Sequence, residues 1–92
     1  MSPLSEQQVA SQLKNLPDWR IESGELARTF TFKDFVASLA FVNKVGEAAE
    51  KAGHHPDIDI RYNRVRLALV THDAGGLTTK DFDLAAVVDK LH

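Results

Sequence analysis

The sequence predicts an α+β fold in which a four-stranded antiparallel sheet is covered by helices on one face. Helical stretches at the start, middle and end of the chain alternate with two pairs of β-rich segments, giving the order α-β-β-α-β-β-α. Within each pair a short turn joins the segments, which indicates two antiparallel hairpins. With 92 residues, the chain has room for one domain, residues 1–92, and hardly for two.

The first third of the chain predicts a short helix followed by a hairpin. Ser5 and the glutamine three residues later have the spacing of a capping box, so a helix is expected over about residues 6–14. Residues 19–22 and 26–32 are rich in β-branched, aromatic and aliphatic side chains. Because the polar segment around Gly24 separates them, we expect them to pair as antiparallel strands.

A long helix is predicted over residues 35–52, with Asp34 as its N-cap and Gly53 as a left-handed C-cap. Two neighbouring rows of small and apolar residues recur at helical spacing along it. We expect the first row to face the core and the second to be a place where subunits meet, since the combined face is wider than one sheet requires. The first row is Phe35, Leu39, Val42, Gly46 and Ala49, and the second is Phe41, Val45 and Ala48.

The second hairpin follows His54-His55-Pro56. Residues 57–62 alternate charged and apolar side chains, which predicts a half-buried strand ending at Tyr62. After a turn near Asn63, a second alternating strand returns to His72. Thr78 then begins the last helix, because Thr78 and Asp81 have capping-box spacing. Its apolar stripe is Leu84, Ala85, Val88 and Leu91.

Composition limits the classes of function. The formal net charge is −2 and the basic residues are scattered, so nothing in the sequence points to direct nucleic-acid binding. The absence of cysteine rules out disulfides and thiolate sites. The chain has no apolar run of the length that a membrane span needs and no signal-like start, so we expect a cytoplasmic protein without membrane contact.

Three of the four histidines flank the second hairpin, with His54 and His55 before it and His72 after it. Antiparallel pairing brings the outer ends of two strands together, so these imidazoles are expected at one end of the sheet, close to Glu50. Imidazole, with a pKa of about 6.5 in isolation, can donate or accept a proton near neutral pH. From the residues alone, a His-His-Pro junction is more often a loop or cap than a catalytic site. Three imidazoles and a carboxylate could also bind zinc, although adjacent extended residues project in divergent directions.

The segment EKAGHHPDIDIRYNRVRLALVTHDAGGLTTKDFDLA closely resembles the signature of the pterin-4a-carbinolamine dehydratases. The resemblance joins Glu50, His54-His55-Pro56, the aromatic Tyr62, His72 and Asp81 at matching spacing. It extends more weakly to the Leu-Pro-Asp-Trp segment ending at Trp19 and to the step into the long helix.

The resemblance implies a hydro-lyase that dehydrates 4a-hydroxytetrahydropterin to quinonoid dihydropterin and water. Such an enzyme recycles the tetrahydrobiopterin-type cofactor of aromatic amino acid hydroxylases and requires no metal or organic cofactor of its own. It implies acid/base catalysis by His54, His55 and His72, with Glu50 and Asp81 in support. The residues expected to contact the pterin are His54, His55, Pro56, Thr71, His72 and Asp73.

Family resemblance also implies a homodimer or homotetramer and a functional link to an aromatic amino acid hydroxylase. Some animal members serve as dimerisation partners and coactivators of a homeodomain transcription factor, which leaves a binding module as the rival class of function. Individual residues have plain structural alternatives. Asp81 can act only as a helix cap, and Trp19 and Tyr62 can be core or rim aromatics.

Overall fold

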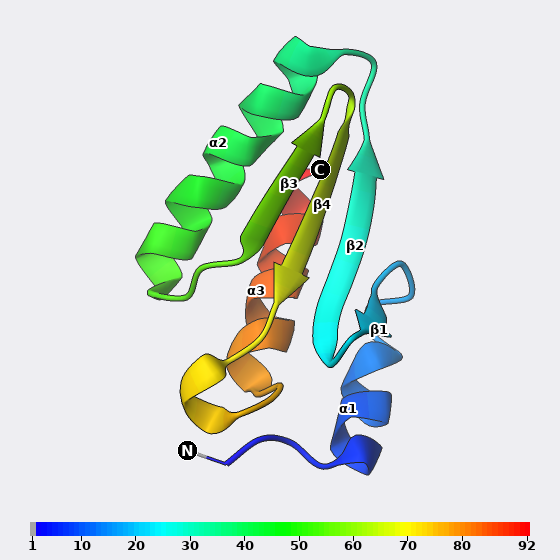
Figure 1. Ribbon diagram of the computed structural model, residues 1–92, viewed down its shortest axis with the longest axis vertical. Coiled ribbons are helices and arrows are strands. Elements are labelled where there is room, and N and C mark those ends of the chain that lie inside the picture. Colours follow the sequence, from blue (N-terminus) through cyan, green and yellow to red (C-terminus); the bar gives the residue numbers. More distant parts are fainter. Residues whose placement is uncertain (1) are drawn as a thin grey trace.

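The protein, described for residues 2–92 by a computed structural model, has the predicted order of elements (Figure 1). The helices are α1 (Glu6–Leu13), α2 (Phe35–Ala52) and α3 (Thr79–Leu91), with a short 3₁₀ turn, η1 (His72–Ala74), before the last. The strands are β1 (Arg20–Glu22), β2 (Glu25–Thr31), β3 (Asp57–Arg61) and β4 (Arg64–Leu69).

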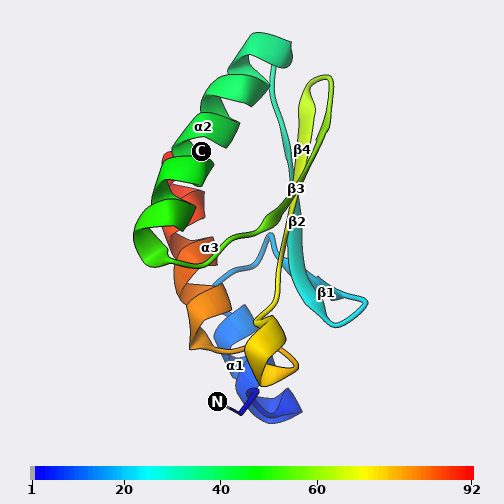
Figure 2. The same ribbon diagram turned by 60° about the vertical axis from the view of Figure 1, so that its left-hand side comes forward.

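The four strands form one antiparallel sheet in the order β1-β2-β4-β3. Helices α2 and α3 lie against one face, and no helix of the described residues covers the other (Figure 2). This is the α+β architecture that the sequence predicts. The central pairing of β2 with β4 sets Leu26 opposite Leu69 and Phe30 opposite Val65. Alternation along each strand then directs these four side chains to the same face, where they are buried.

Local signals place the ends of the helices where the sequence predicts them. Ser5 caps α1 through a complete capping box, and the Asp34 carboxylate accepts a hydrogen bond from the Ala37 amide at 2.8 Å at the start of α2. Gly53 ends α2 in the left-handed conformation, with φ of 64°. Thr78 and Asp81 form the expected capping box of α3. These boundaries depend on contacts between near neighbours, so they could be predicted from sequence.

The core lies between the sheet and the two long helices. Phe30 is its centre: Trp19 meets this ring edge-on, and the ring of Phe41 from α2 lies 4.7 Å away between centroids. The fully buried Val45 and Val88 bring α2 and α3 onto the same layer. The predicted stripe of α3 is confirmed, because Leu84, Ala85 and Val88 are buried and Leu91 packs against the core.

The prediction for the core face of α2 is wrong in part. The buried residues of the helix are Ser38, Phe41, Val45 and Ala49. Phe41 and Val45, which were assigned to a subunit contact, therefore face the core, whereas Ala49 of the row assigned to the core is buried as expected. Of the row assigned to the core, Phe35 is 44% and Leu39 is 38% exposed. The helix is rotated by about a quarter of a turn from the expected orientation. The polar Ser38 interrupts the apolar pattern of this face in the sequence. Its burial is tolerated because its hydroxyl donates a hydrogen bond to the Asp34 carbonyl at 3.0 Å.

The predicted end of the third strand is also wrong. Tyr62 belongs to the turn between β3 and β4, with φ of 52°, and it is 65% exposed. The strand therefore ends at Arg61, although the alternation of charged and apolar residues in the sequence continues to Tyr62. Within residues 2–92 no helix has both the length and the apolar character needed to cross a membrane.

Candidate functional site

The end of α2 fixes the first two histidines. Two backbone hydrogen bonds of a Schellman motif close the helix: the Gly53 amide donates to the Glu50 carbonyl at 3.2 Å, and the His54 amide donates to the Ala49 carbonyl at 3.1 Å. The left-handed glycine turns the chain sharply, and His55 and Pro56 then lead into β3. His54 is therefore held by its own backbone immediately beside the helix.

The third histidine lies just beyond the end of β4. Thr71 pairs with Gly76 in an isolated antiparallel bridge, and the five residues between Val70 and Gly76 turn back through η1, which begins at His72. Gly75 closes η1 with φ of 74°. This tight loop holds His72 at the end of the sheet from which β3 departs, as antiparallel pairing predicts.

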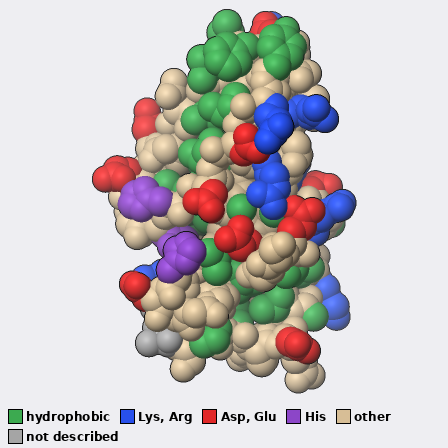
Figure 3. All heavy atoms as spheres, in the orientation of Figure 1, with side chains coloured by type: hydrophobic (Ala, Val, Ile, Leu, Met, Phe, Trp, Pro, Cys, Tyr) green, Lys and Arg blue, Asp and Glu red, His purple; other side chains and the backbone are tan. Residues whose placement is uncertain are grey.

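All three histidines line one open hollow of about 300 Å³. Histidine side chains gather on one flank of the molecule, between the end of α2 and η1 (Figure 3). The walls come from three segments: the junction after α2, the end of β4 with η1, and the first turn of α3. The lining residues are Gly53, His54, His55, Val70, Thr71, His72, Asp73 and Lys80.

His54 is held by a carboxylate that has no exposed surface. Its Nε2 lies 2.5 Å from Asp81 Oδ1, and the exposed fractions of the two side chains are 12% and 0%. The other carboxylate oxygen accepts hydrogen bonds from the Thr71 hydroxyl and the Thr78 amide, each at 2.9 Å. Three donors thus replace the water that the buried carboxylate has lost.

This network assigns a role to each nitrogen of the His54 ring. An ionised carboxylate has no proton to donate, so the proton between the two groups belongs to Nε2. In neutral His54 the lone pair is then on Nδ1, which can accept a proton, while Asp81 stabilises the imidazolium that results. A histidine whose ring is oriented by a carboxylate in this way can act as a general base.

His55 makes a second histidine–carboxylate pair in a different setting. Its Nε2 lies 2.6 Å from Glu50 Oε2, but the side chains are 63% and 80% exposed. Glu50 itself does not line the hollow. Its contact with the lining residues is made through the side chain of His55.

Three residues that carry the sequence resemblance lie outside this arrangement. Pro56 does not line the hollow, although it directly follows His55. Trp19 is a core residue, 3% exposed, and its Nε1 donates to Asp89 at 2.8 Å. Tyr62 lies at the opposite end of the β3–β4 hairpin from the histidines.

The sequence did not predict three of the lining residues, Gly53, Val70 and Lys80, of which only Lys80 has an ionisable side chain. Lys80 follows the N-cap Thr78 by two residues, and the Thr78 hydroxyl accepts a hydrogen bond from its amide at 3.3 Å. The sequence offered one indication of this position, because Lys80 immediately precedes Asp81, which was already a candidate site residue. The zinc alternative finds no support in the part of the chain that the structure describes, where no group of three or more His, Asp or Glu is placed to hold a metal ion.

Comparisons with known proteins agree on one family. A family model described as pterin 4 alpha carbinolamine dehydratase matches residues 2–91. Relatives provisionally named pterin-4-alpha-carbinolamine dehydratase occur in Acidobacterium capsulatum, 62% identical over 99% of both chains, and in Chloroflexus aurantiacus, 62% identical over 99% of this chain and 98% of the relative.

Two solved structures share the fold. The transcriptional coactivator/pterin dehydratase from Brucella melitensis superposes with a TM-score of 0.93 at 32% identity and covers 98% of both chains. A pterin dehydratase-like protein described as a RuBisCO assembly factor in the alpha-carboxysome has a TM-score of 0.69 at 26% identity. This superposition covers 80% of this chain and 88% of the other chain.

Proposed function

The chain belongs to the pterin 4 alpha carbinolamine dehydratase family, and we propose that it dehydrates 4a-hydroxytetrahydropterin to quinonoid dihydropterin and water. The observation that carries this proposal is the hollow lined by three imidazoles, one of them oriented by a fully buried carboxylate. The reaction needs one group that donates a proton and one that accepts a proton, and this hollow contains candidates for both.

The proposed step breaks the C4a–O and N5–H bonds of the substrate and forms the C4a=N5 double bond and an O–H bond of the released water. A histidine donates a proton to the hydroxyl on C4a, and the C4a–O bond breaks to release water. A second histidine takes the proton from N5, and the electron pair of the N5–H bond completes the C4a=N5 double bond. One histidine loses a proton and the other gains one, so the net charge of the site does not change. Proton exchange with solvent then restores each histidine to its starting state.

His54 and His72 are assigned to these two transfers. His54 has the setting of a base, because Asp81 fixes its tautomer and stabilises its protonated form. His72 faces the same hollow from η1 and serves as the acid. A positioned acid or base typically raises a rate by about 10² to 10⁴. Since the reaction needs only two proton transfers and the departure of water, the proposal includes no metal or organic cofactor.

The remaining residues bind the pterin or support the residues that contact it. His55, oriented by Glu50, and Asp73 lie at the edge of the hollow, where they can hydrogen-bond the polar edge of the ring. Thr71 belongs to the network under His54, and Pro56 sets the direction in which the chain leaves His55.

Stopped-flow ultraviolet absorbance tests the proposal directly. A hydroxylase generates the carbinolamine in situ, and its decay is followed with no added protein, with the wild type, with His54→Ala and with His92→Ala. His92 packs against Phe30, Phe32 and Phe41 outside the hollow, so it is the matched histidine control. We expect acceleration by the wild type and by His92→Ala, and a loss of about 10²-fold in His54→Ala. Decay at the spontaneous rate in the presence of wild type contradicts the activity and favours a partner-binding module.

The proposal includes a cytoplasmic homodimer or homotetramer that recycles pterin for an aromatic amino acid hydroxylase. Support for self-association comes from the exposed side of α2, where Val36 is 74% exposed beside Phe35 and Leu39. Sedimentation equilibrium of the wild type and of Leu39→Lys tests it, because a charge on that face should shift the equilibrium toward monomer. A monomeric wild type at micromolar concentration contradicts the assembly.

A further inference from the structure

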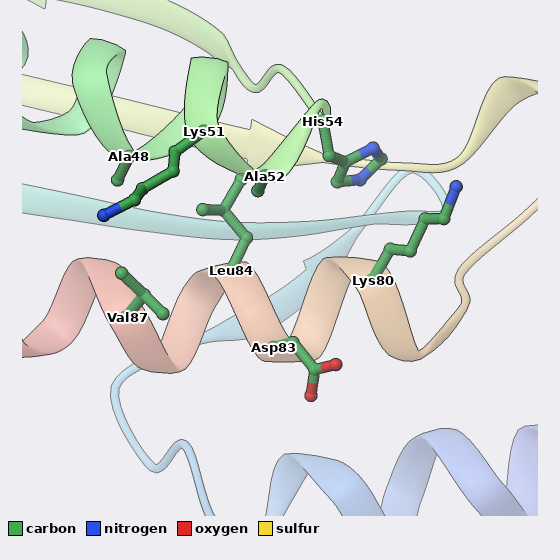
Figure 4. Close-up of a pocket in the computed structure, with 8 residues that line it drawn as sticks. All are labelled: Ala48, Lys51, Ala52, His54, Lys80, Asp83, Leu84 and Val87. Carbon is green, nitrogen blue, oxygen red and sulfur yellow. The ribbon is translucent and has the colours of Figure 1, made fainter.

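A second hollow, of about 320 Å³, lies between α2 and α3 next to the histidine hollow. Its apolar lining comes from Ala48 and Ala52 of α2 and from Leu84 and Val87 of α3. Figure 4 shows that His54 and Lys80 lie at one end of this interhelical groove and that the Lys51 side chain extends toward the other.

The sequence explains why the groove is open. Ala48 and Ala52 are four residues apart and therefore share one face of α2. Lys80, Leu84 and Val87 have the same kind of spacing on α3. Alanine side chains are too short to fill the space between two helices, so the larger side chains of α3 face a gap. The result is an apolar slot with a lysine near each end and one carboxylate, that of Asp83 on α3, among its lining residues.

The two hollows share His54 and Lys80 as lining residues. The structure of the pterin ring relates this connection to the position of the C6 substituent. In the ring, C4a is bonded to N5 and N5 to C6, so the first atom of any substituent on C6 is three bonds from the carbon that loses its hydroxyl. A pterin whose N5 lies against His54 therefore carries its C6 substituent toward the border between the hollows.

We propose that the interhelical groove binds the C6 substituent of the pterin, and that this protein prefers substrates in which that substituent is an aromatic ring followed by a carboxylate. The inference rests on the proposed function, because it places N5 beside His54. It adds a substrate class and a binding site to that function.

The length and charge of the groove select this class. Lys80 and Val87 are seven residues apart, which corresponds to about 10 Å along α3, a distance that one aromatic ring with a short linker spans. The apolar walls favour a ring over a hydroxylated chain. Beyond the ring, the Lys51 ammonium offers a partner for a carboxylate at the end distant from His54.

The first experiment compares two carbinolamines, one derived from 6-methyl-tetrahydropterin and one from tetrahydrofolate, whose C6 substituent is an aminobenzoyl-glutamate. The measured quantity is the ratio of their kcat/KM values, which cancels any general loss of activity. We expect the wild type to favour the aminobenzoyl substrate by about tenfold, a factor consistent with burying part of one ring. A ratio of one or less in the wild type overturns the proposal.

Variants locate the preference in the groove. Ala52→Phe fills the slot from α2 and should reduce the ratio to about one, whereas Ala40→Phe adds the same side chain at an exposed position of α2 outside the groove and should leave it unchanged. Lys51→Gln should reduce the ratio by about threefold, as expected for a solvent-exposed ion pair, with Lys44→Gln as its control. Equal ratios in Ala52→Phe and the wild type contradict the assignment of the groove.

Binding measurements keep this proposal separate from the proposed activity. The dissociation constants of 6-methyl-7,8-dihydropterin and 7,8-dihydrofolate are measured for the wild type and Ala52→Phe by isothermal titration calorimetry. Tighter binding of dihydrofolate that is lost in Ala52→Phe supports the groove even if no turnover is detected. Turnover of both substrates with equal dissociation constants retains the activity and rejects the groove, and absence of binding rejects both.

Discussion

Two adjacent histidines each contact a carboxylate, and the nitrogen–oxygen distances of the two pairs are almost the same. His54 is 2.5 Å from Asp81, and His55 is 2.6 Å from Glu50. Their surroundings differ completely, because the Asp81 side chain has no exposed surface and the Glu50 side chain is 80% exposed. The Asp81 carboxylate has two further donors within the protein, whereas Glu50 is open to water.

The difference shows that distance alone does not measure what a pair contributes. An exposed pair competes with water and salt, and such pairs contribute about 0–1 kcal/mol to stability. A buried pair is screened much less, and removal of one partner leaves the other without compensation. We therefore expect the His54–Asp81 pair to determine both catalysis and local stability, and the His55–Glu50 pair to make a smaller adjustment.

The largest effect is expected for Asp81→Asn. This variant keeps the shape of the side chain but removes the charge that stabilises protonated His54, so kcat should fall about 10²-fold. The free energy of unfolding should fall by about 1–3 kcal/mol, because hydrogen bonds to a buried charged group are weakened. Stopped-flow kinetics and urea denaturation measure the two quantities. Asp59→Asn, at an exposed carboxylate on the open face of the sheet, is the control, and a folded Asp81→Asn with kcat within twofold of wild type would contradict the buried pair's role.

A smaller effect is expected for Thr71→Val, which has nearly the same shape as threonine but no hydroxyl. The change removes one donor to Asp81 and leaves the Thr78 hydroxyl, 2.8 Å from that of Thr71, without this partner. The free energy of unfolding should fall by about 1–2 kcal/mol, and urea denaturation measures it. Thr29→Val, at an exposed position of β2, provides the comparison. Equal stability of Thr71→Val and wild type would show that the network under His54 adds nothing.

The smallest effect is expected for Glu50→Gln. Because the pair with His55 is exposed, the free energy of unfolding should change by less than about 0.5 kcal/mol. KM should rise by about threefold, since His55 loses the charge that orients it, while kcat changes less than KM. Added salt should raise KM of the wild type in the same direction and should have less effect on Glu50→Gln. A fall in kcat as large as that of Asp81→Asn would reverse the ranking of the two pairs.

The fold was predictable from the sequence where local contacts decide it. The capping residues Ser5, Asp34 and Thr78 each bond an amide two or three residues away, and Gly53 adopts a conformation that glycine tolerates without strain. Because neither partner depends on distant parts of the chain, the three helices begin where these signals predict. The order of elements and the antiparallel pairing of neighbouring segments follow from the same kind of local information.

The orientation of α2 was not predictable in this way. Two apolar rows compete along the helix, and the row containing Phe35 and Leu39 has the more regular apolar pattern in sequence. The sheet binds the row containing Phe41 and Val45 instead, because the Phe41 ring packs against Phe30. The polar Ser38 lies on that face and is satisfied by a backbone carbonyl of its own helix. Which of two faces is buried depends on the shape of the surface opposite, and sequence periodicity contains no information on that shape.

For the site, the sequence by itself determined that the three histidines are brought together. An antiparallel hairpin between His55 and His72 places its two outer ends side by side whatever its other contacts are. Only the tertiary structure decided how those residues are paired and how far each is buried. Asp81 lies 27 residues after His54, and their contact exists because α3 packs beside the end of α2. The strength of a polar contact depends on its exposure to water, which packing of the whole chain sets, so the same pairing of an imidazole with a carboxylate is firmly held in one place and exposed in the other.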